Sequence, residues 1–331
     1  MLLAGDIGGT KTVLALFNES GDITQPVHEA TFPSEKYPSL EAIITRFLVE
    51  HPVTLTAASF GVAGPVMKNR AQITNLPWVI DAQTISEQFQ IPSVHLLNDL
   101  AAIATAVPHL TDTDLVTLNQ GHPVEGGTIA VIAPGTGLGE AFLVWTGSQY
   151  IPVPSEGGHA AFGPTTPLQV ELLTYMQNIY GHVSYERVCS GSGIPNLYNF
   201  LKDAGHYPEP EWLRQQLAQA EDPTPIIVTH GRNKSCDLCA ATVDLFVEIL
   251  GGEAGNLAMK VLATGGVYIG GGIPPRILPE LQEADFMAAF VYKGRFSAMM
   301  EQIPIHVIRN AKTALFGAAY DSLHNYQAGQ K

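Results

Sequence analysis

Short apolar runs alternate along the chain with longer stretches in which apolar residues recur at helical spacing. Near the start, the apolar residues 2–4 and 13–17 flank residues 6–11, a polar segment with two glycines. A second unit of this form follows, in which residues 129–132 and 141–145 flank the glycine-rich residues 135–139. Two apolar runs joined by a glycine turn are typical of a β-hairpin. The alternation predicts an α/β protein, and the repeated hairpin indicates two similar halves.

The two glycine turns differ from the commonest nucleotide-binding loops. The Rossmann and Walker loops each lead from a strand into a helix, and neither motif occurs in this sequence. Here each turn leads into another strand. A single Gly-Gly-Thr turn is usually only a tight β-turn, but two in matching contexts favour a different interpretation. Their backbone N–H groups could grip a polyphosphate between two domains.

Polar and glycine residues stand at the ends of two further predicted strands. Residues 94–97 form a strand that ends in Asn98 and Asp99, and a helix follows. Asp99 is therefore either a helix N-cap or a carboxylate at the sheet edge where ligands of α/β proteins bind. Residues 267–269 form a strand that ends in three glycines, with a helix predicted from Arg276. These glycines either let a planar nucleoside lie against the backbone or mark only a close turn.

Two segments between these strands carry further candidate side chains. Glu156 and His159 lie on a glycine-rich, irregular segment, and segments of this kind often carry function, although a plain surface turn is the alternative. Glu186 precedes Ser190 and Gly191, and by itself this acid is typical of an exposed helix face.

Composition narrows the classes of partner and compartment. The chain has 31 acidic and 17 basic residues, a net charge of −14, and no cluster of Lys and Arg, so we expect no nucleic-acid or anionic-lipid partner. No run approaches the roughly 18 apolar residues that a membrane span needs. Asp6 interrupts the first apolar run, which argues against a signal peptide, and three cysteines favour a reducing compartment. We therefore expect a cytoplasmic protein without a membrane partner.

Taken in order along the chain, six motifs resemble those of the bacterial glucokinases, which belong to the sugar kinase, actin and Hsp70 ATPase superfamily. They are Asp6-Ile7-Gly8-Gly9-Thr10, Asn98-Asp99, Gly135-Thr136-Gly137-Leu138-Gly139, Glu156-Gly157-Gly158-His159, Glu186-Arg187 with Ser190-Gly191, and Gly270-Gly271-Gly272-Ile273. The resemblance covers nearly the whole chain, and six motifs in this order are specific although each is common. It implies two actin-like (ribonuclease H-like) α/β ATPase domains flanking a deep cleft that closes on the sugar. Residues 1–109 plus 311–331 would form the small domain, and residues 110–310 the large one.

The resemblance also implies the reaction and the residue roles. A cytoplasmic homodimer would transfer the γ-phosphoryl group of ATP to the 6-hydroxyl of glucose, a step of glycolysis, with Asp99 as the general base. The sugar would be bound by Asn98, Asp99, Glu156, His159 and Glu186. The nucleotide would be bound by Asp6, Gly8, Gly9, Thr10, Lys11, Gly135, Thr136, Gly137, Gly270, Gly271 and Gly272, with Asp6 near Mg²⁺ through water. These roles are chemically sound, because a carboxylate can accept the proton of the attacking alcohol and polar side chains can pair with hydroxyls.

Two positions depart from the family's pattern. Lys11 stands where many of these glucokinases have Asn, and it either aids phosphate binding or points into solvent. Residues 310–313 replace the family's usual Asn-Pro-Gly-Leu, which leaves the contact between the C-terminal helix and the nucleotide open.

Two other functions compete with this interpretation, and one related family has to be distinguished from it. A kinase of another hexose or an amino sugar would share the fold, and a sugar sensor without turnover is less favoured because the base and both turns are intact. The related repressor, open reading frame and kinase family carries a Cys-rich zinc motif. Here Cys236 and Cys239 form a single Cys-x-x-Cys, whereas structural zinc normally needs four ligands. We expect no zinc, and two buried thiols on one helix face.

Overall fold

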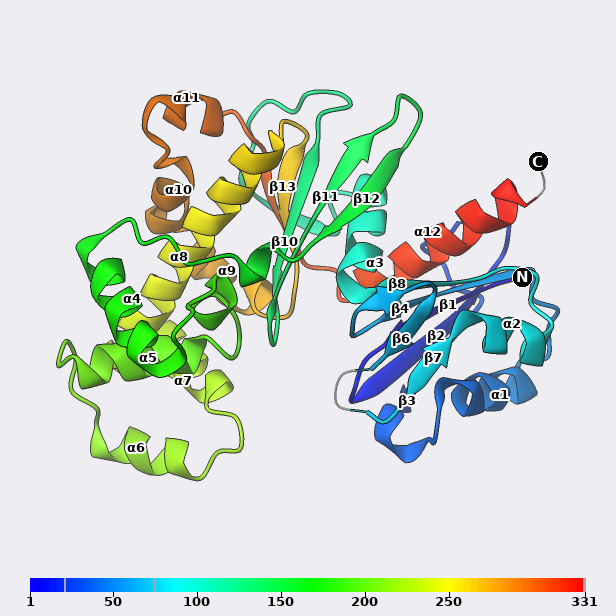
Figure 1. The fold of residues 1–331 in the computed structure, drawn as a ribbon, viewed down its shortest axis with the longest axis horizontal. Helices are drawn as coiled ribbons and strands as arrows, with labels where there is room; N and C mark the ends of the chain where they lie inside the picture. Colours follow the sequence, from blue (N-terminus) through cyan, green and yellow to red (C-terminus); the bar gives the residue numbers. More distant parts are fainter. Residues whose placement is uncertain (21, 74–75, 330–331) are drawn as a thin grey trace. The chain divides into compact units, whose positions relative to one another are not determined.

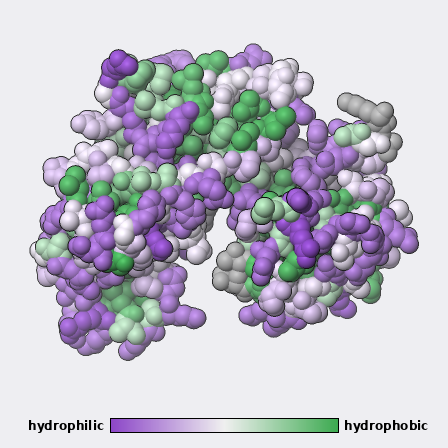
Figure 2. Space-filling view, in the orientation of Figure 1, coloured by the Kyte–Doolittle hydropathy of each residue, from purple (hydrophilic) through white to green (hydrophobic). Residues whose placement is uncertain are grey.

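The computed structural model describes residues 1–20, 22–73 and 76–329, which form two compact units (Figure 1). The first unit contains Met1–Thr113, Tyr150–Val153 and Asn310–Lys331, and the second contains Asp114–Gln149 and Pro154–Arg309. Each unit combines a mixed sheet with helices, which confirms the predicted α/β class. Figure 2 shows hydrophilic residues spread over the drawn face of both units. No helix among the described residues is long and apolar enough to cross a bilayer.

The first unit contains a five-stranded sheet. Its strands, in order across the sheet, are β3 (His28–Pro33), β2 (Lys11–Phe17), β1 (Leu2–Ile7), β4 (Ala57–Val62) and β8 (Val94–Asn98). Strands β1 and β2 pair antiparallel, which confirms the first predicted hairpin, whereas β1, β4 and β8 run parallel. A small second sheet consists of β5 (Val66–Met67), β6 (Arg70–Gln72) and β7 (Val79–Asp81).

Alternate residues of β1 serve two separate cores. Leu3 and Ile7 pack in one core with helices α1 (Leu40–Glu50) and α2 (Ala82–Phe89). Leu2 and Ala4 pack in the other with helix α12 (Thr313–Ala328). Successive side chains of a strand point to opposite faces, so a nearly continuous apolar run is what a sheet buried on both faces requires. Helices α1 and α2 and helix α12 accordingly cover opposite faces of this sheet (Figure 1).

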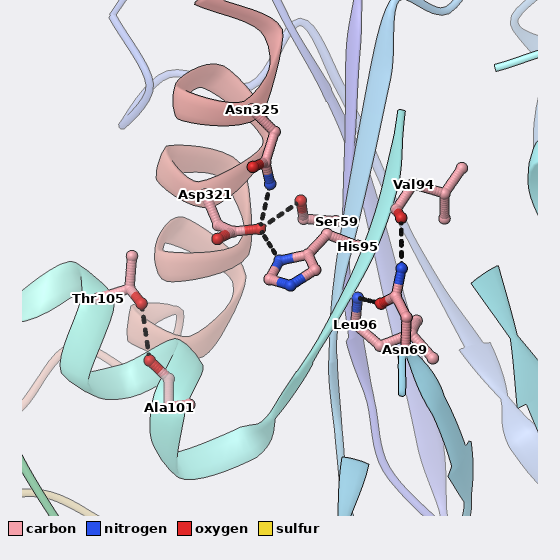
Figure 3. Close-up of polar contacts among 9 residues, drawn as sticks. All are labelled: Ser59, Asn69, Val94, His95, Leu96, Ala101, Thr105, Asp321 and Asn325. Atoms are coloured by element: carbon pink, nitrogen blue, oxygen red, sulfur yellow. Dashed lines mark hydrogen bonds and ion pairs between the residues drawn. The ribbon is translucent and has the colours of Figure 1, made fainter. Parts of the chain in front are cut away.

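Helix α12 attaches to this sheet through a carboxylate that is only partly exposed (Figure 3). Asp321 Oδ2 accepts hydrogen bonds from Ser59 Oγ at 2.7 Å and Asn325 Nδ2 at 2.9 Å, and lies 2.7 Å from His95 Nδ1. Helix α12 also packs against helix α3 (Asp99–Ala106). The two helices are so close that a Cβ added at Gly317 of α12 would overlap the carbonyl oxygen of Ala102 on α3. The C-terminal segment is thus an integral part of the first unit.

The second unit contains five strands of a six-stranded sheet and the end of the sixth, at residues 154–155. Its strands, in order across the sheet, are β12 (Tyr150–Ser155), β11 (Leu138–Trp145), β10 (Ile129–Pro134), β13 (Gly266–Ile269), β14 (Ile305–Ile308) and β9 (Leu115–Asn119). Strands β10 and β11 pair antiparallel with Pro134 opposite Leu138, which confirms the second predicted hairpin. Strands β10, β13 and β14 run parallel.

One hydrophobic core joins this sheet to the helices of the second unit. The helices are α4 (Pro167–Tyr180), α5 (Ile194–Asp203), α6 (Glu211–Ala218), α7 (Thr224–Arg232), α8 (Asp237–Val261), α9 (Leu278–Leu281), α10 (Ala284–Val291) and α11 (Ser297–Met300). Ala130 and Ile132 of β10 pack in this core with Leu250 and Ala254 of α8, the longest of these helices. Short 3₁₀ helices also occur in the chain, at Ser34–Lys36, Val107–His109, Gly157–His159, Tyr185–Arg187, Pro274–Ile277 and Gly294–Phe296.

Two sequence predictions in this unit need correction. Cys236 and Cys239 are buried free thiols, but Cys236 is the extended residue that precedes α8 and only Cys239 lies on the helix. Burial, reinforced by neighbouring Cys236, raises the pKa of the Cys239 thiol, which keeps that thiol protonated. The helix predicted from Arg276 begins as a 3₁₀ helix at Pro274 and becomes α-helical at Leu278.

Candidate active site

Asp99 lies at the junction between β8 and α3, and its neighbour caps the helix. Asn98 Oδ1 accepts a hydrogen bond from the backbone N of Ala101 at 2.7 Å, so Asn98 is the N-cap and the alternative that gave this role to Asp99 is wrong. Asp99 is the first residue of the helix, and its Oδ1 accepts from the backbone N of Leu100 at 2.8 Å. Burial raises the pKa of the Asp99 carboxyl, and the backbone N–H groups of Leu100 and of Asp99 itself oppose the rise.

Asp6 lies at the same edge of the sheet as Asp99. The parallel pairing sets Ile7 beside Val62 and Val62 beside Asn98, so the carboxyl ends of β1 and β8 are level. Burial raises the pKa of the Asp6 carboxyl, Lys11 opposes this rise, and the negative charge of Asp99 adds to it. Two carboxylates therefore converge at the edge where ligands of parallel sheets bind.

The first glycine turn is held by its own backbone. Gly8 N donates to Lys11 O at 2.9 Å, and Ser34 Oγ donates to Gly8 O at 2.8 Å. Since the Gly8 N–H is engaged within the turn, a phosphate would have to be met by the residues that follow it. Thr10 and Lys11 are exposed there.

The second glycine turn is enclosed by the segment that contains Glu186. Gly135 O accepts from Gly191 N at 2.7 Å, and Glu186 Oε2 accepts from the backbone N of Leu138 at 3.1 Å. A Cβ added at Gly137 would overlap this carboxylate oxygen. Glu186 lies half-buried in a 3₁₀ helix and faces the turn, so the interpretation of an exposed helix face is wrong. In the structure, the predicted sugar-binding residue Glu186 therefore contacts the predicted phosphate-binding turn of Gly137.

Glu156 and His159 lie side by side on a turn after β12. Glu156 Oε2 and His159 Nε2 are 3.9 Å apart, and their side chains are 87% and 62% exposed. The segment predicted to be irregular forms one turn of 3₁₀ helix, Gly157–His159, which ties His159 N to Glu156 O at 3.0 Å. Both side chains can therefore reach a ligand from the solvent side.

The third glycine motif packs on one side and is open on the other. Gly270 N donates to Ile132 O at 2.8 Å, and Gly271 has a φ of 86°. A Cβ at Gly271 would overlap the carbonyl oxygen of Pro134, whereas one at Gly272 would meet nothing within 4 Å. Gly271 is thus required for the close turn, and Gly272 leaves backbone accessible beside it.

Comparisons with known proteins decide the family. A sequence profile described as glucokinase matches residues 3–324. A glucokinase of Trichormus variabilis is 41% identical over 337 residues, which cover 96% of this chain and 98% of that protein. The chain belongs to the glucokinase family. It is thereby an ATP-dependent hexose kinase.

Glucokinases of known structure share its fold. The crystal structure of a glucokinase from an Antarctic psychrotroph superposes with a TM-score of 0.86 at 33% identity, over 98% of both chains. A ROK family glucokinase from Streptomyces griseus, solved with glucose and AMPPNP, superposes with a TM-score of 0.63 at 18% identity, over 98% of this chain and 99% of that one. These likenesses confirm the fold class that the resemblance implied.

Two hydrogen bonds form at the start of α12, where the sequence departs from the family's usual Asn-Pro-Gly-Leu. Lys312 Nζ donates to Glu29 Oε2 at 2.8 Å, and Thr313 Oγ1 donates to Asn310 O at 2.7 Å. These bonds hold the first residues of α12 to Glu29 and to the backbone of Asn310.

Sequence reasoning missed two pairs of residues that the fold brings together. His95 and Asp321 join β8 to α12, and Glu140 and Glu253 are two acids that are 1% and 0% exposed in the second unit. The available signals were a histidine or an acid inside an otherwise apolar strand, and an acid in the apolar run of α8. These signals mark single residues but do not identify partners.

The residues present also suit a magnesium ion held with few protein ligands. Among the described residues, no group of three or more His, Cys, Asp or Glu side chains could enclose a metal ion. Asp6 supplies the oxygen ligand that Mg²⁺ prefers, and its raised pKa reflects a buried negative charge that a cation would stabilise. Mg²⁺ usually keeps several waters and binds substrate phosphates, which fits a single carboxylate.

Proposed function

We propose that this member of the glucokinase family transfers the γ-phosphoryl group of ATP to the 6-hydroxyl of D-glucose, with Asp99 as the general base. The observation that carries the proposal is the position of Asp99. It lies at the carboxyl end of a parallel strand, at the start of a helix and at the same sheet edge as Asp6. Family membership supports the substrates.

The Asp99 carboxylate has the properties that a general base needs. An alcohol is a poor nucleophile, and a carboxylate that accepts its proton as the bond to phosphorus forms assists the attack. The burial that raises the pKa of Asp99 makes this carboxylate a stronger base. Its hydrogen bond to Leu100 N holds one oxygen in place.

The sugar is bound in this proposal by Asn98, Glu156, His159 and Glu186, together with Asp99. Because Asn98 Oδ1 caps α3, its amide N–H₂ group would donate to a sugar hydroxyl. The exposed pair Glu156 and His159 adds an acceptor and a ring nitrogen. A sugar that lacks a matching hydroxyl would leave one of these groups unpaired, and that penalty provides selectivity.

The nucleotide is bound in this proposal by the three glycine turns. Gly9, Thr10 and Lys11, with Gly135, Thr136 and Gly137, would contact the phosphates, and Gly8 would hold the first turn closed through its own backbone bond. The turn Gly270, Gly271 and Gly272 would face the adenosine. Asp6 would hold Mg²⁺ through water, and the ion would supply charge neutralisation on the phosphates. Lys11 is exposed, so its ammonium group is free to approach a phosphate from solvent.

The test is ATP-dependent phosphorylation of glucose, mannose, fructose, N-acetylglucosamine and N-acetylmannosamine by the native protein and Asp99→Asn. We expect preference for glucose, and a loss of about 10²- to 10⁴-fold in kcat with retained glucose binding in the variant. Preference for another sugar would keep the mechanism and change the substrate. Glucose binding without turnover by the native protein would move the chain to the sensor class, and full activity of Asp99→Asn would remove Asp99 as the base.

Four further expectations belong to this proposal. They are a homodimer, a cytoplasmic location, division into a small domain of residues 1–109 plus 311–331 and a large one of residues 110–310, and closure of the domains on glucose. The acidic composition and the three free cysteines support the location. Light scattering would measure the mass of the particle. Small-angle scattering with and without glucose would test closure, and unchanged dimensions would contradict it.

A further inference from the structure

A buried acid lies beneath the turn that carries Glu156 and His159. Glu140 is on β11, two residues after Leu138, and is only 1% exposed. A Cβ added at Gly157 would overlap Glu140 Oε2, and one added at Gly158 would overlap the carbonyl oxygen of Leu138. The backbone of the turn therefore rests directly on β11, with the Glu140 carboxyl under Gly157.

A second acid faces Glu140 from helix α8. Glu253 is fully buried and accepts hydrogen bonds from Asn256 Nδ2 at 2.9 Å and from Lys260 Nζ at 3.3 Å. Asn256 Nδ2 also donates to Tyr185 Oη at 2.9 Å. Glu253 thus has the donors that stabilise a carboxylate, whereas Glu140 Oε1 has no hydrogen-bond partner within the part of the chain that the structure describes.

The charges around Glu140 favour its neutral form. Burial raises the pKa of Glu140 to about 8, the negative charge of Glu253 adds to this rise, and Lys260 opposes it. Lys260 already pairs with Glu253, and its side chain is 54% exposed, so its charge is partly screened by solvent.

The other titratable groups near the pair do not supply a compensating charge to Glu140. Burial raises the pKa of the Tyr185 hydroxyl and of the Cys189 thiol. Glu253 adds to the first rise, and Glu253 and Glu140 both add to the second. Burial lowers the pKa of Lys293, whose Nζ donates to Gly252 O at 2.9 Å. Tyr185 and Cys189 therefore remain neutral, and the ammonium group of Lys293 is hydrogen-bonded to the Gly252 carbonyl.

We propose that protonated Glu140 is a positioning residue for the turn of Glu156 and His159, and that loss of its proton displaces this turn and weakens glucose binding. The proposal rests on the role given above to those two side chains. The step is the transfer of one proton from the Glu140 carboxylic acid to water, and no other bond is made or broken.

The displacement follows from the cost of a second buried charge. An ionised Glu140 would face ionised Glu253 with an oxygen that has no donor, and an unpaired buried carboxylate requires solvation. Strand β11 is fixed in the sheet and α8 is fixed in the core, whereas the Glu156 and His159 side chains above are exposed. The turn is thus the part that can move to admit water, and its movement shifts both sugar-binding side chains.

The experiment measures KM for glucose, KM for ATP and kcat on both sides of pH 8. We expect KM for glucose in the native enzyme to rise above about pH 8, approaching tenfold per pH unit, because each pH unit is a tenfold change in protonation. Glu140→Gln, which stays neutral, should show a flat profile. Glu248→Gln, an acid-to-amide change at a half-buried position of the same helix α8, should keep the native rise. The inference is overturned if KM for glucose stays flat in the native enzyme or rises equally in Glu140→Gln.

Two further measurements separate this inference from the proposed sugar site. Glu156→Ala at neutral pH tests the sugar site alone, since an unchanged KM for glucose would remove Glu156 from it whatever the pH profile shows. The infrared carbonyl band of a protonated carboxyl, present in the native protein and absent from Glu140→Gln, tests the proton alone.

If Glu140→Gln does not fold, Gly157→Ala replaces it, because its methyl group would lift the turn and should raise KM for glucose at every pH. An unchanged KM in that variant would also overturn the inference.

Discussion

His95 Nδ1 on strand β8 lies 2.7 Å from Asp321 Oδ2 on helix α12 (Figure 3). The contact joins β8 to a helix that is far from it in the sequence. His95 lies three residues before Asn98 on β8. The hydrogen bond to Asp321 raises the pKa of His95, burial opposes this, and the negative charge of Asp321 adds to the rise. Helix α12 is therefore attached most strongly to β8 when the imidazole is protonated.

Replacing Asp321 by Asn should destabilise the protein in a pH-dependent way. A raised folded pKa for His95 means that its contribution is full below its unfolded pKa, about 6.5, and is lost as the pH rises through the folded value. Because His95 is 43% exposed, we expect only about 1 kcal/mol at acidic pH, with a smaller difference at alkaline pH. Urea unfolding at several pH values measures this, with His324→Asn on the same helix as the control. A pH-independent difference would contradict the ionic role.

The acidic limb of the pH–rate profile should depend on Asp99. A general base must be deprotonated, so kcat/KM should fall as the pH drops through the pKa of Asp99, which burial places above the ordinary value of 3.8. Residual activity of Asp99→Asn should lack this limb. Initial rates at saturating ATP over the acidic range measure both enzymes, and persistence of the limb in the variant would assign it to another group.

Gly137→Ala should disturb the sugar side of the site more than the fold. The added methyl group would overlap Glu186 Oε2, which is the movable end of a side chain, so Glu186 would give way. We expect KM for glucose to rise about tenfold or more, the loss expected for a hydrogen bond to a charged group. Gly252→Ala is the matched control, since its methyl group meets nothing within 4 Å. Equal KM values in the two variants would contradict a role of Glu186 at the sugar.

The Glu140 carboxyl should also make stability fall with rising pH. Its pKa rises from 4.5 to about 8 on folding, so between these values the folded state keeps a proton that the unfolded state loses. The free energy of unfolding should then decrease by up to about 1.4 kcal/mol per pH unit in this range. Guanidinium unfolding of the native protein and Glu140→Gln across this range isolates the contribution as a difference in slope. Parallel profiles for the two proteins would show that Glu140 ionises normally.

Removal of divalent cations should abolish turnover without unfolding the protein. We expect EDTA to stop phosphorylation and added Mg²⁺ to restore it, because the phosphates need charge neutralisation for transfer. Asp6→Asn should raise the Mg²⁺ concentration required while leaving thermal stability equal or higher, since it removes a buried negative charge. Titration of activity with Mg²⁺ tests this, and an unchanged requirement in the variant would remove Asp6 from the metal site.

Local sequence patterns were sufficient to predict several elements. Both hairpins follow from two apolar runs around a glycine turn, and β8 followed by α3 follows from an apolar strand that ends in a capping residue. The order of the six motifs along the chain was enough to indicate the family. These features depend on residues within a few positions of one another, so turn chemistry and hydrophobic period are sufficient to predict them.

Contacts between residues that are distant in the chain depend on how the elements pack, and local patterns do not predict them. By itself Glu186 is typical of a surface acid, but the fold places it in contact with the turn of Gly137. The residue types also left open whether Asn98 or Asp99 caps α3, and the backbone geometry of the folded chain makes Asn98 the cap. The pairs Glu140 with Glu253 and His95 with Asp321 form because strands and helices distant in the chain pack together. Burial and neighbouring charge then set the pKa of each group, and both are properties of packing that no local sequence pattern contains.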